Sequence, residues 1–218
     1  MDGFHDLGGV QGFGPVPHKI NSLSYKPVFK QEWEHLAYSL MFLGAGHMGL
    51  FSIDEVRHAV ERIGLRQHVG TQYYERYIIA TASLLVEKGI ITQAELDAEL
   101  GKPFQLASPA TSQGRNVIPV ESPFEIGERV RVKDERISGH IRVPAYCRGK
   151  EGIILHRTTE KWPFPDAIGH GDQSALPQPT YHVQFSSKEL WDDAGDEGSI
   201  IVDLFEGYLE RSVEESNL

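Results

Sequence analysis

Hydrophobic residues recur at helical spacing from the segment 28–44 onward. A repeat of three to four positions places side chains on one face of a helix, and here it predicts an amphipathic helix that ends near Gly44. The apolar residues that carry this repeat are Trp33, Leu36, Ala37, Leu40 and Met41.

Two capping boxes mark the starts of further helices. In a capping box, a hydroxyl and a carboxylate three residues apart each accept a hydrogen bond from the other residue's backbone N–H. Ser52 with Glu55 and Thr92 with Glu95 have this spacing, and each pair predicts the start of a helix. Between them, the apolar period of residues 71–89 predicts one more helix. The N-terminal half is thus predicted to be all-helical.

The pattern changes after Gly101. Residues 102–122 are rich in Pro, Ser and Thr and have no sustained period, as expected of a surface linker. Beyond them, apolar and polar residues alternate in short runs bounded by Gly or Pro, which predicts strands. These runs lie within 123–134, 149–156, 180–185 and 199–205. Several short strands of this kind predict a small barrel or roll.

Together the patterns predict an α+β protein in four parts. An extended arm, residues 1–27, is rich in Gly and polar residues and precedes a helical domain of residues 28–101. The linker, residues 102–122, then leads to a β domain of residues 123–218.

Composition narrows the possible functions. The 218-residue chain is 40% hydrophobic and carries a formal net charge of -10, which disfavours binding to nucleic acid or to anionic lipid. No apolar run reaches the roughly 18 to 20 residues of a membrane helix, and the N-terminal residues do not resemble a signal peptide, so a cytoplasmic protein is expected. The single cysteine excludes an internal disulfide, and no Cys-x-x-Cys or His-x-x-x-His spacing suggests a metal site.

Two motifs admit a chemical interpretation that their surroundings do not support. The sequence GAGHMG, residues 44–49, has the glycine spacing of a dinucleotide-binding loop, but it follows a predicted helix rather than a strand, which favours a turn between helices. Cys147 is a possible nucleophile with His140 and Asp134 nearby in sequence. A lone cysteine is more often a small buried apolar residue.

Two other groups remain open on pattern alone. Asp166, His170 and Asp172 could hold a metal ion, although a polar loop rich in Gly gives the same spacing by chance. Tyr73 and Tyr77 lie one helical turn apart, and either a core position or the wall of a pocket fits them.

Longer stretches resemble the β subunit of nitrile hydratase, in the order found in that family, from Met1 to about Glu210. The stretches are MDGFHDLGGVQGFGPVPH, EWEHLAYSLMF, YYERY, GHIRVPAYCRGKEG, WPFPDAIGHG, TYHVQF and VDLFEGYLE. The resemblance implies an SH3-like C-terminal barrel and an N-terminal arm that wraps a partner.

The same resemblance implies a lyase that adds water to a small nitrile to give an amide, active only with an α subunit, as an αβ unit that is often doubled to α2β2. A Cys-x-x-Cys-Ser-Cys cluster of the α subunit would hold a non-haem Fe(III) or Co(III) ion, with two of its thiolates oxidised. This chain has no such cluster and is expected to bind no metal itself. Ile141, where the cobalt branch usually has Thr, points to iron.

The resemblance also implies roles for individual residues. Arg57 and Arg142 match the family arginines that reach the oxidised cysteines, where a planar guanidinium can donate two parallel hydrogen bonds. Cys147 takes no role from the family, and Arg148 is expected at the surface or in contact with the α subunit. The residues expected to line the substrate pocket are Tyr38, Met41, Phe42, Tyr73 and Tyr77.

Two alternatives remain beside the hydratase. The chain could be a stand-alone SH3-like module that binds a partner without catalysis, or a hydrolase that uses Cys147 as its own nucleophile. The first requires no partner with a thiolate cluster, and the second requires a reactive thiol.

Overall fold

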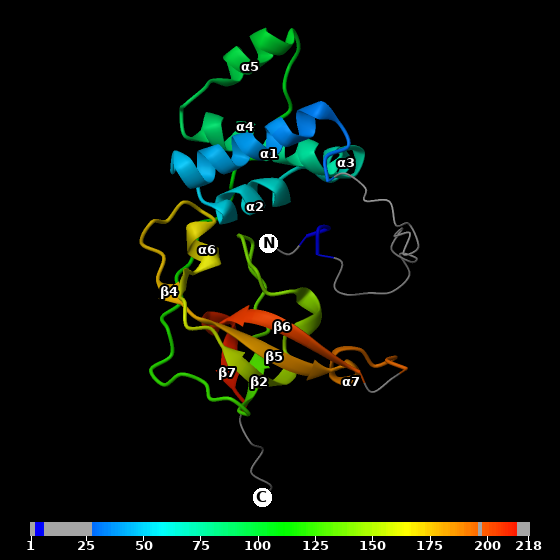
Figure 1. The fold of residues 1–218 in the computed structure, drawn as a ribbon, viewed down its shortest axis with the longest axis vertical. Coiled ribbons are helices and arrows are strands. Elements are labelled where there is room, and N and C mark those ends of the chain that lie inside the picture. The colour runs from blue at the N-terminus through cyan, green and yellow to red at the C-terminus, as the bar shows by residue number, and fades with distance from the viewer. Residues whose placement is uncertain (1–2, 7–27, 196–197, 213–218) are drawn as a thin grey trace, which may run out of the picture. The chain divides into compact units, whose positions relative to one another are not determined.

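A computed structural model describes residues 3–6, 28–195 and 198–212 of the chain (Figure 1). The chain divides into two compact units: one is Val10–Ala110, and the other is Met1–Gly9 together with Thr111–Leu218. The first contains helices, and the second is built on an antiparallel sheet, so the mixed fold with a helical N-terminal half is confirmed. Over the described ranges, no helix has both the length and the apolar character that a membrane span requires.

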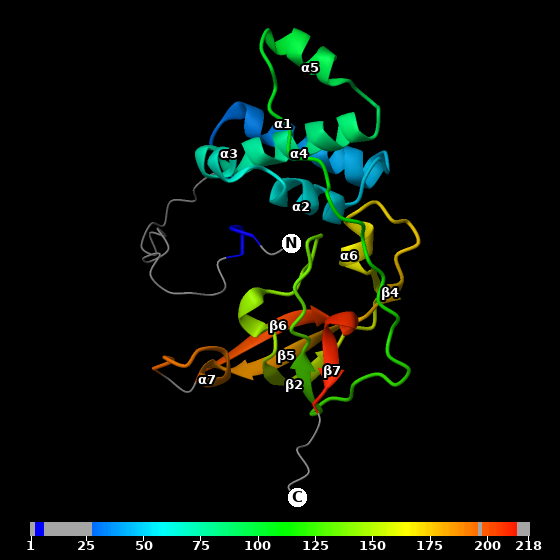
Figure 2. The ribbon, with the colours of Figure 1, turned by 180° about the vertical axis from the view of Figure 1, so that it is seen from behind.

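The described residues of the helical unit form five α-helices, and both predicted capping boxes form. Figures 1 and 2 show the arrangement of these helices. The Ser52 hydroxyl accepts from the Glu55 N–H at 3.0 Å, and the Glu55 carboxylate accepts from the Ser52 N–H at 2.6 Å. Thr92 and Glu95 form the second box. The sequence did not predict α3 as a separate helix. The helices are α1 (Glu32–Phe42), α2 (Ile53–Glu61), α3 (Leu65–Gly70), α4 (Tyr73–Glu87) and α5 (Gln93–Leu100).

The glycine motif at the end of α1 serves packing. The α-helix ends at Phe42, close to Gly44 as predicted, and a π-helical turn, η1 (Leu43–His47), follows it directly; the Met48 N–H donates to the Leu43 carbonyl at 2.8 Å. A Cβ on Gly44 would lie only 2.4 Å from the Phe51 ring, so this position must lack a side chain. A helix, not a strand, precedes the motif, which is the context of a turn between helices.

The apolar residues of α1 do not all face the core. Ala37 and Met41 are buried against the other helices, whereas Leu36 is 62% exposed and Leu40 is 50% exposed. The repeat read from the sequence therefore combines two apolar faces, one directed inward and one directed to solvent. Buried residues of the main helical core are Met41, Phe51, Val56, Ala59, Ala80 and Leu84.

The second unit is built on a five-stranded antiparallel sheet in the order β6-β5-β2-β1-β7. The four predicted strand regions are confirmed, and the short β7 and the two-stranded β3–β4 sheet were missed. The strands are β1 (Arg129–Val132), β2 (Glu151–Arg157), β3 (Trp162–Pro163), β4 (Pro177–Gln178), β5 (Thr180–Ser186), β6 (Ser199–Phe205) and β7 (Leu209–Arg211). The short helical elements are η2 (Ala145–Cys147), α6 (Pro165–Ile168), α7 (Ser187–Leu190) and η3 (Glu206–Tyr208).

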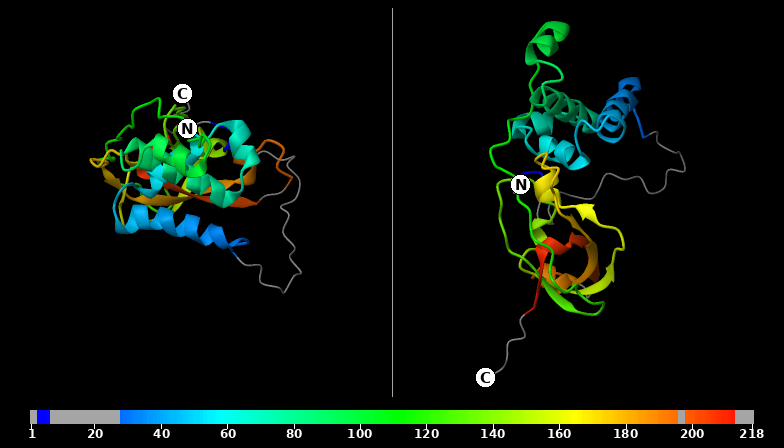
Figure 3. Two further views of the ribbon diagram at one scale, coloured as in Figure 1. Left: turned by 90° about the horizontal axis from the view of Figure 1, so that it is seen from above. Right: turned by 90° about the vertical axis from the view of Figure 1, so that its left-hand side faces the viewer.

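The sheet is curved but not closed (Figure 3). Its edge strands β6 and β7 do not pair with each other within the described residues, so the expected barrel is an open, curved sheet. Alternate residues of β1 and β5 are buried, as period-two patterning requires. The core of this unit includes Val130, Val132, Ile154, Tyr181, Val183, Phe185, Leu204 and Tyr208.

The predicted linker is described in full, whereas only a short piece of the predicted arm is described. Residues 102–122 contain no helix or strand; the Ala107 N–H donates to Ser83 in the helical unit, and the Arg115 N–H donates to the Asp166 carbonyl in the other unit. Of the arm, residues 7–27 lie outside the described ranges. Asp6 is described, and its carboxylate accepts from the Ala145 N–H at 2.8 Å.

Close packing between β2 and β5 predicts a strong effect of a small substitution. A Cβ on Gly152 would lie 2.6 Å from the Val183 side chain and 2.8 Å from the Gln184 carbonyl oxygen. We expect Gly152→Ala to lower the free energy of unfolding by about 1–3 kcal/mol, because the core has no space for the methyl group. Gly195→Ala is the matched control in the same unit, since nothing lies within 4 Å of its added Cβ. Denaturant unfolding of both variants measures the difference, and equal stabilities would contradict the packing described.

Candidate functional site

Aromatic side chains from α1 and α4 form a continuous cluster in the helical unit. Ring centroids are 4.5 Å apart between Tyr38 and Phe42, and 5.0 Å apart between Tyr73 and Tyr77. Tyr74 lies between these pairs, 5.1 Å from Tyr73 and 6.4 Å from Tyr38. We call Phe29, Tyr38, Phe42, Tyr73, Tyr74 and Tyr77 the aromatic cluster.

Four of the five residues predicted to line a pocket belong to this cluster, and one does not. Tyr38, Phe42 and Tyr73 are exposed, and Tyr77 is half-buried. Met41 is only 3% exposed and packs into the helical core. The sequence analysis missed Phe29 and Tyr74; the adjacent Tyr in YYERY was the available signal for Tyr74.

The phenols of Tyr73 and Tyr77 are in hydrogen-bond contact, with 2.8 Å between their oxygens. Burial and this hydrogen bond raise the pKa of Tyr77 to about 12, against the opposing effect of the positive charge on Arg57. Tyr77 therefore stays uncharged near neutral pH and offers a polar tip on an otherwise aromatic surface.

Arg57, on α2, is available for a further contact. Its guanidinium pairs with Asp54, with 2.7 Å between Nη1 and Oδ1, and its side chain is 45% exposed. An exposed pair three residues apart on one helix contributes little to stability. The helix α2 packs against α4, which carries Tyr77, and the positive charge of Arg57 opposes the rise in the pKa of Tyr77.

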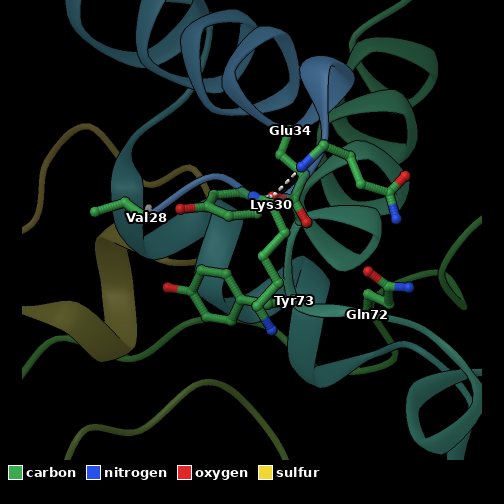
Figure 4. A pocket seen from close by; sticks show the side chains of 7 residues that line it. Val28, Lys30, Glu34, Gln72 and Tyr73 are labelled. Carbon is green, nitrogen blue, oxygen red and sulfur yellow. Dashed lines mark hydrogen bonds between the residues drawn. The ribbon is translucent and has the colours of Figure 1, made fainter. Parts of the chain in front are cut away.

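A pocket of about 550 Å³ opens beside the start of α1 and α4 (Figure 4). The Glu34 carboxylate on its wall accepts from the backbone N–H groups of Lys30 and Gln31, which fixes the first turn of α1. Only Tyr73 of the predicted residues lines this pocket. The lining residues are Val28, Lys30, Gln31, Glu34, Gln72, Tyr73 and Tyr74.

Arg142 lies in the other unit, on a loop between β1 and β2. Its side chain is exposed, whereas its neighbours Ile141 and Val143 are 7% and 4% exposed. Its backbone N–H donates to the Tyr208 hydroxyl at 3.1 Å. Within the described ranges, no carboxylate pairs with the Arg142 guanidinium, in contrast to Arg57 and Arg115.

Two later residues of the same loop, Cys147 and Arg148, are buried. Arg148 is 8% exposed and donates from Nη2 to the Val143 carbonyl at 3.1 Å, so the expectation of a surface residue is wrong. The hydrogen bond from the Arg148 guanidinium thus holds the backbone of the loop at Val143. Cys147 is fully buried, its Sγ lies 3.2 Å from the Pro144 carbonyl oxygen, and burial raises the pKa of its thiol to about 12. A thiol that stays protonated is not a nucleophile, which weighs against the Cys147 hydrolase.

The three side chains after β3 that were considered as metal ligands make hydrogen bonds within the chain instead. Asp166 binds Tyr208 and Arg115, and Asp172 accepts from the Ser174 N–H at 2.8 Å. His170 accepts from the His140 N–H at 3.1 Å. Among the residues that the structure describes, no group of three or more His, Cys, Asp or Glu side chains is arranged to hold a metal ion.

Comparison with known proteins identifies the family. Two family models match the chain: one described as nitrile hydratase beta subunit, N-terminal, over residues 1–117, and one described as nitrile hydratase beta subunit, C-terminal, over residues 112–211. The chain belongs to the nitrile hydratase β-subunit family. The family predicted from the sequence is thus confirmed, as is its function as a subunit of a nitrile hydratase.

Individual relatives match this chain over nearly their whole length. The nitrile hydratase subunit beta of Pseudomonas chlororaphis is 70% identical over 212 residues, covering 97% of this chain and 96% of the relative. That of Rhodococcus erythropolis is 60% identical over 211 residues, covering 96% and 99%. The cobalt-containing nitrile hydratase subunit beta of Pseudonocardia thermophila is 31% identical over 231 residues, covering 96% of each chain.

The buried thiol gives a direct prediction for the nitrile hydratase. We expect Cys147→Ala to leave turnover nearly unchanged and to cost less than about 2 kcal/mol of stability, because the thiol fills space and is not ionised. After a thiol-specific reagent is added to the native complex at pH 7.5, the mass of this chain, measured by mass spectrometry, should stay constant. Rapid labelling of Cys147, or loss of turnover in Cys147→Ala, would restore the nucleophile hypothesis.

Proposed function

We propose that this β subunit completes the active site of an α subunit by donating hydrogen bonds from Arg142 and Arg57 to its oxidised metal-ligand cysteines. The observation that carries the proposal is the exposed Arg142 guanidinium, which has no acidic partner within the described residues, on a loop whose neighbouring side chains are buried. An anion supplied by another chain fits this arrangement, since a buried or interface arginine pairs with an acceptor.

The metal belongs to the partner in this proposal. The chain has one cysteine, which is buried and protonated, so it offers no thiolate set for a transition metal. When bound in the α subunit, the metal supplies Lewis-acid activation for nitrile hydration. The residues of this chain have other tasks: the arginines hold anionic oxygens in place, and the aromatic cluster shapes the substrate cavity and excludes water.

An exposed apolar surface supports a large interface with the α subunit. Leu36, Leu40 and Leu43 are each at least half exposed and lie on α1 and η1. Apolar side chains that gather on one surface are typical of a protein interface. We place the α subunit here, with the arm of residues 1–27 wrapped around it, in an αβ unit that doubles to α2β2.

Finer assignments follow the same line. We assign the metal as Fe(III) rather than Co(III), because Ile141 departs from the threonine of the cobalt branch and because the relatives named as cobalt-containing are only 31–32% identical. We further propose that the curved sheet is an SH3-like roll and that the two domains span residues 28–101 and 123–218. The complex, in this proposal, works in the cytoplasm on small nitriles. The match to the family models over residues 1–211 disfavours the stand-alone module.

Arg142→Lys tests the proposed role of the guanidinium. Lysine keeps the charge but loses the planar fork, so at least one charge-assisted hydrogen bond, worth about 1.5–3 kcal/mol, should be lost. We expect turnover to fall by about ten-fold to over a hundred-fold, at about 1.36 kcal/mol per decade. Arg57→Lys should act in the same direction.

The control for this experiment is Arg129→Lys, an exposed arginine on β1 with a 3.6 Å ion pair to Glu151. Arg148 is unsuitable, because its side chain is buried and supports the loop. Metal content and subunit ratio are measured beside turnover in the co-expressed complex. Equal activity of Arg142→Lys and Arg129→Lys at full metal content would refute the proposal.

The aromatic cluster is tested through Tyr77. We expect Tyr77→Ala to change the ranking of aliphatic against aromatic nitriles more than it changes assembly, because a cavity wall sets the shape of the substrate. Tyr77→Phe keeps the ring and removes only the hydroxyl that contacts Tyr73, so it separates shape from hydrogen bonding. The measurement is kcat/KM for a series of nitriles, and an unchanged ranking in Tyr77→Ala would exclude Tyr77 from the cavity.

A further inference from the structure

The loop that carries Arg142, residues 138–143, forms no strand, yet two of its backbone amides are held by side chains. The His140 N–H donates to His170 Nε2 at 3.1 Å, and the Arg142 N–H donates to the Tyr208 hydroxyl at 3.1 Å. Buried backbone groups need a hydrogen-bond partner. Here an imidazole and a phenol take the place that a neighbouring strand has in a sheet.

Tyr208 is oriented by a buried carboxylate. Its hydroxyl donates to Asp166 Oδ1, which leaves the phenol oxygen free to accept from the Arg142 N–H. The other carboxylate oxygen, Oδ2, accepts from Arg115 Nε at 2.8 Å. Burial raises the pKa of Tyr208 well above its usual value, so the hydroxyl keeps the hydrogen that it donates. The result is one connected chain of hydrogen bonds from Arg115 to the backbone of Arg142.

The anchoring residues are themselves fixed. Tyr208 is 2% exposed, and its carbonyl accepts from the Lys133 N–H at 2.9 Å, beside the β1–β7 pairing. The Asp166 side chain is fully buried on α6. The backbone of Arg142 can therefore move little while Tyr208 and Asp166 stay in place.

Packing leaves the loop little room to shift. A Cβ on Gly139 would lie 2.6 Å from His170 Nε2, and a Cβ on Gly169 would lie 2.5 Å from the His140 ring. Ile141 and Val143, on either side of Arg142, are buried. The backbone from which the Arg142 side chain extends is thus held by hydrogen bonds and by close packing.

We propose that Tyr208, held by Asp166, is a positioning residue that fixes the backbone of Arg142 and thereby the direction in which its guanidinium meets the partner subunit. This inference rests on the proposed role of Arg142. A bidentate contact tolerates little displacement, so loss of the anchor should weaken catalysis although Tyr208 itself touches no substrate.

The test compares Tyr208→Phe with Tyr181→Phe in the co-expressed αβ complex. Tyr181 is an internal match: it is also fully buried, and its hydroxyl donates to the Glu206 carboxylate at 2.9 Å. Both variants lose a buried hydroxyl bonded to a carboxylate, but only Tyr208→Phe removes the acceptor for the Arg142 N–H.

Two measurements are made at full metal content. Amide hydrogen exchange of a peptide covering residues 138–143 should be about ten-fold faster in Tyr208→Phe than in Tyr181→Phe, because a hydrogen-bonded amide exchanges only when it opens. Turnover should fall by about ten-fold in Tyr208→Phe, mainly in kcat, and should stay near the wild-type value in Tyr181→Phe. Thermal unfolding of both variants shows how much stability each has lost.

Each outcome decides one claim. If both variants have the same exchange and the same kcat, Tyr208 is a structural residue only and the inference is wrong. If exchange rises in Tyr208→Phe while Arg142→Lys remains fully active, the anchor is real but the proposed role of Arg142 fails, and with it the effect on catalysis.

A second variant keeps the inference testable if Tyr208→Phe assembles poorly with the α subunit. Arg115→Gln removes the ion pair to Asp166, and since the Arg115 side chain is 29% exposed, this change should be tolerated. It should raise the exchange of the same peptide above that of Tyr181→Phe. Exchange equal to that of Tyr181→Phe would overturn the inference.

Discussion

The buried carboxylate of Asp166 connects the parts of the C-terminal unit on which the proposed function depends. It accepts from Arg115, in the same unit, and from Tyr208 at the end of η3, and Tyr208 in turn holds the backbone of Arg142. Burial raises the pKa of Asp166, against the stabilising effect of these two donors on its charged form. Burial disfavours the charged form of this carboxylate, and the hydrogen bonds from its two donors offset that cost.

The helical unit has a different construction. Its proposed site is aromatic, and its polar groups include the phenols of Tyr73 and Tyr77, which contact each other, and the guanidinium of Arg57. Apolar residues of α1 lie on both its inner and outer faces, which leaves Leu36 and Leu40 in contact with solvent. An exposed apolar face of this kind is typical of a surface that another chain covers, as proposed for the α subunit.

Sequence reasoning was most successful where the signal is local. Both capping boxes, the main helices and four strand regions follow from spacing alone, because a helix start or an alternating strand depends on neighbours within a few residues. The family resemblance supplied Arg57 and Arg142, which no periodicity distinguishes from other arginines.

Long-range partners could not be predicted in the same way. The link from Arg142 to Tyr208 spans 66 residues, and the link from Tyr208 to Asp166 spans 42, so no pattern in the sequence brings them together. Asp166 was noticed as a possible metal ligand, but its partners are Tyr208 and Arg115. Arg148 was misjudged for the same reason, since only the folded loop shows that its guanidinium is covered.

The contrast between Arg142 and Arg115 suggests how assembly and site formation are coupled. Arg115 already has two carboxylate partners inside the chain, whereas the Arg142 guanidinium faces solvent, where its charge is stabilised by water. On docking, that water is lost, and removal of a charge from water is compensated only by a well-placed anion. A guanidinium loses its hydration more easily than an ammonium, and its planar fork can meet two oxygens at once. On the proposed assignment, the αβ complex is therefore favoured when the partner's cysteines carry anionic oxygens, so that the subunits select one another by the same contact that prepares the site for catalysis.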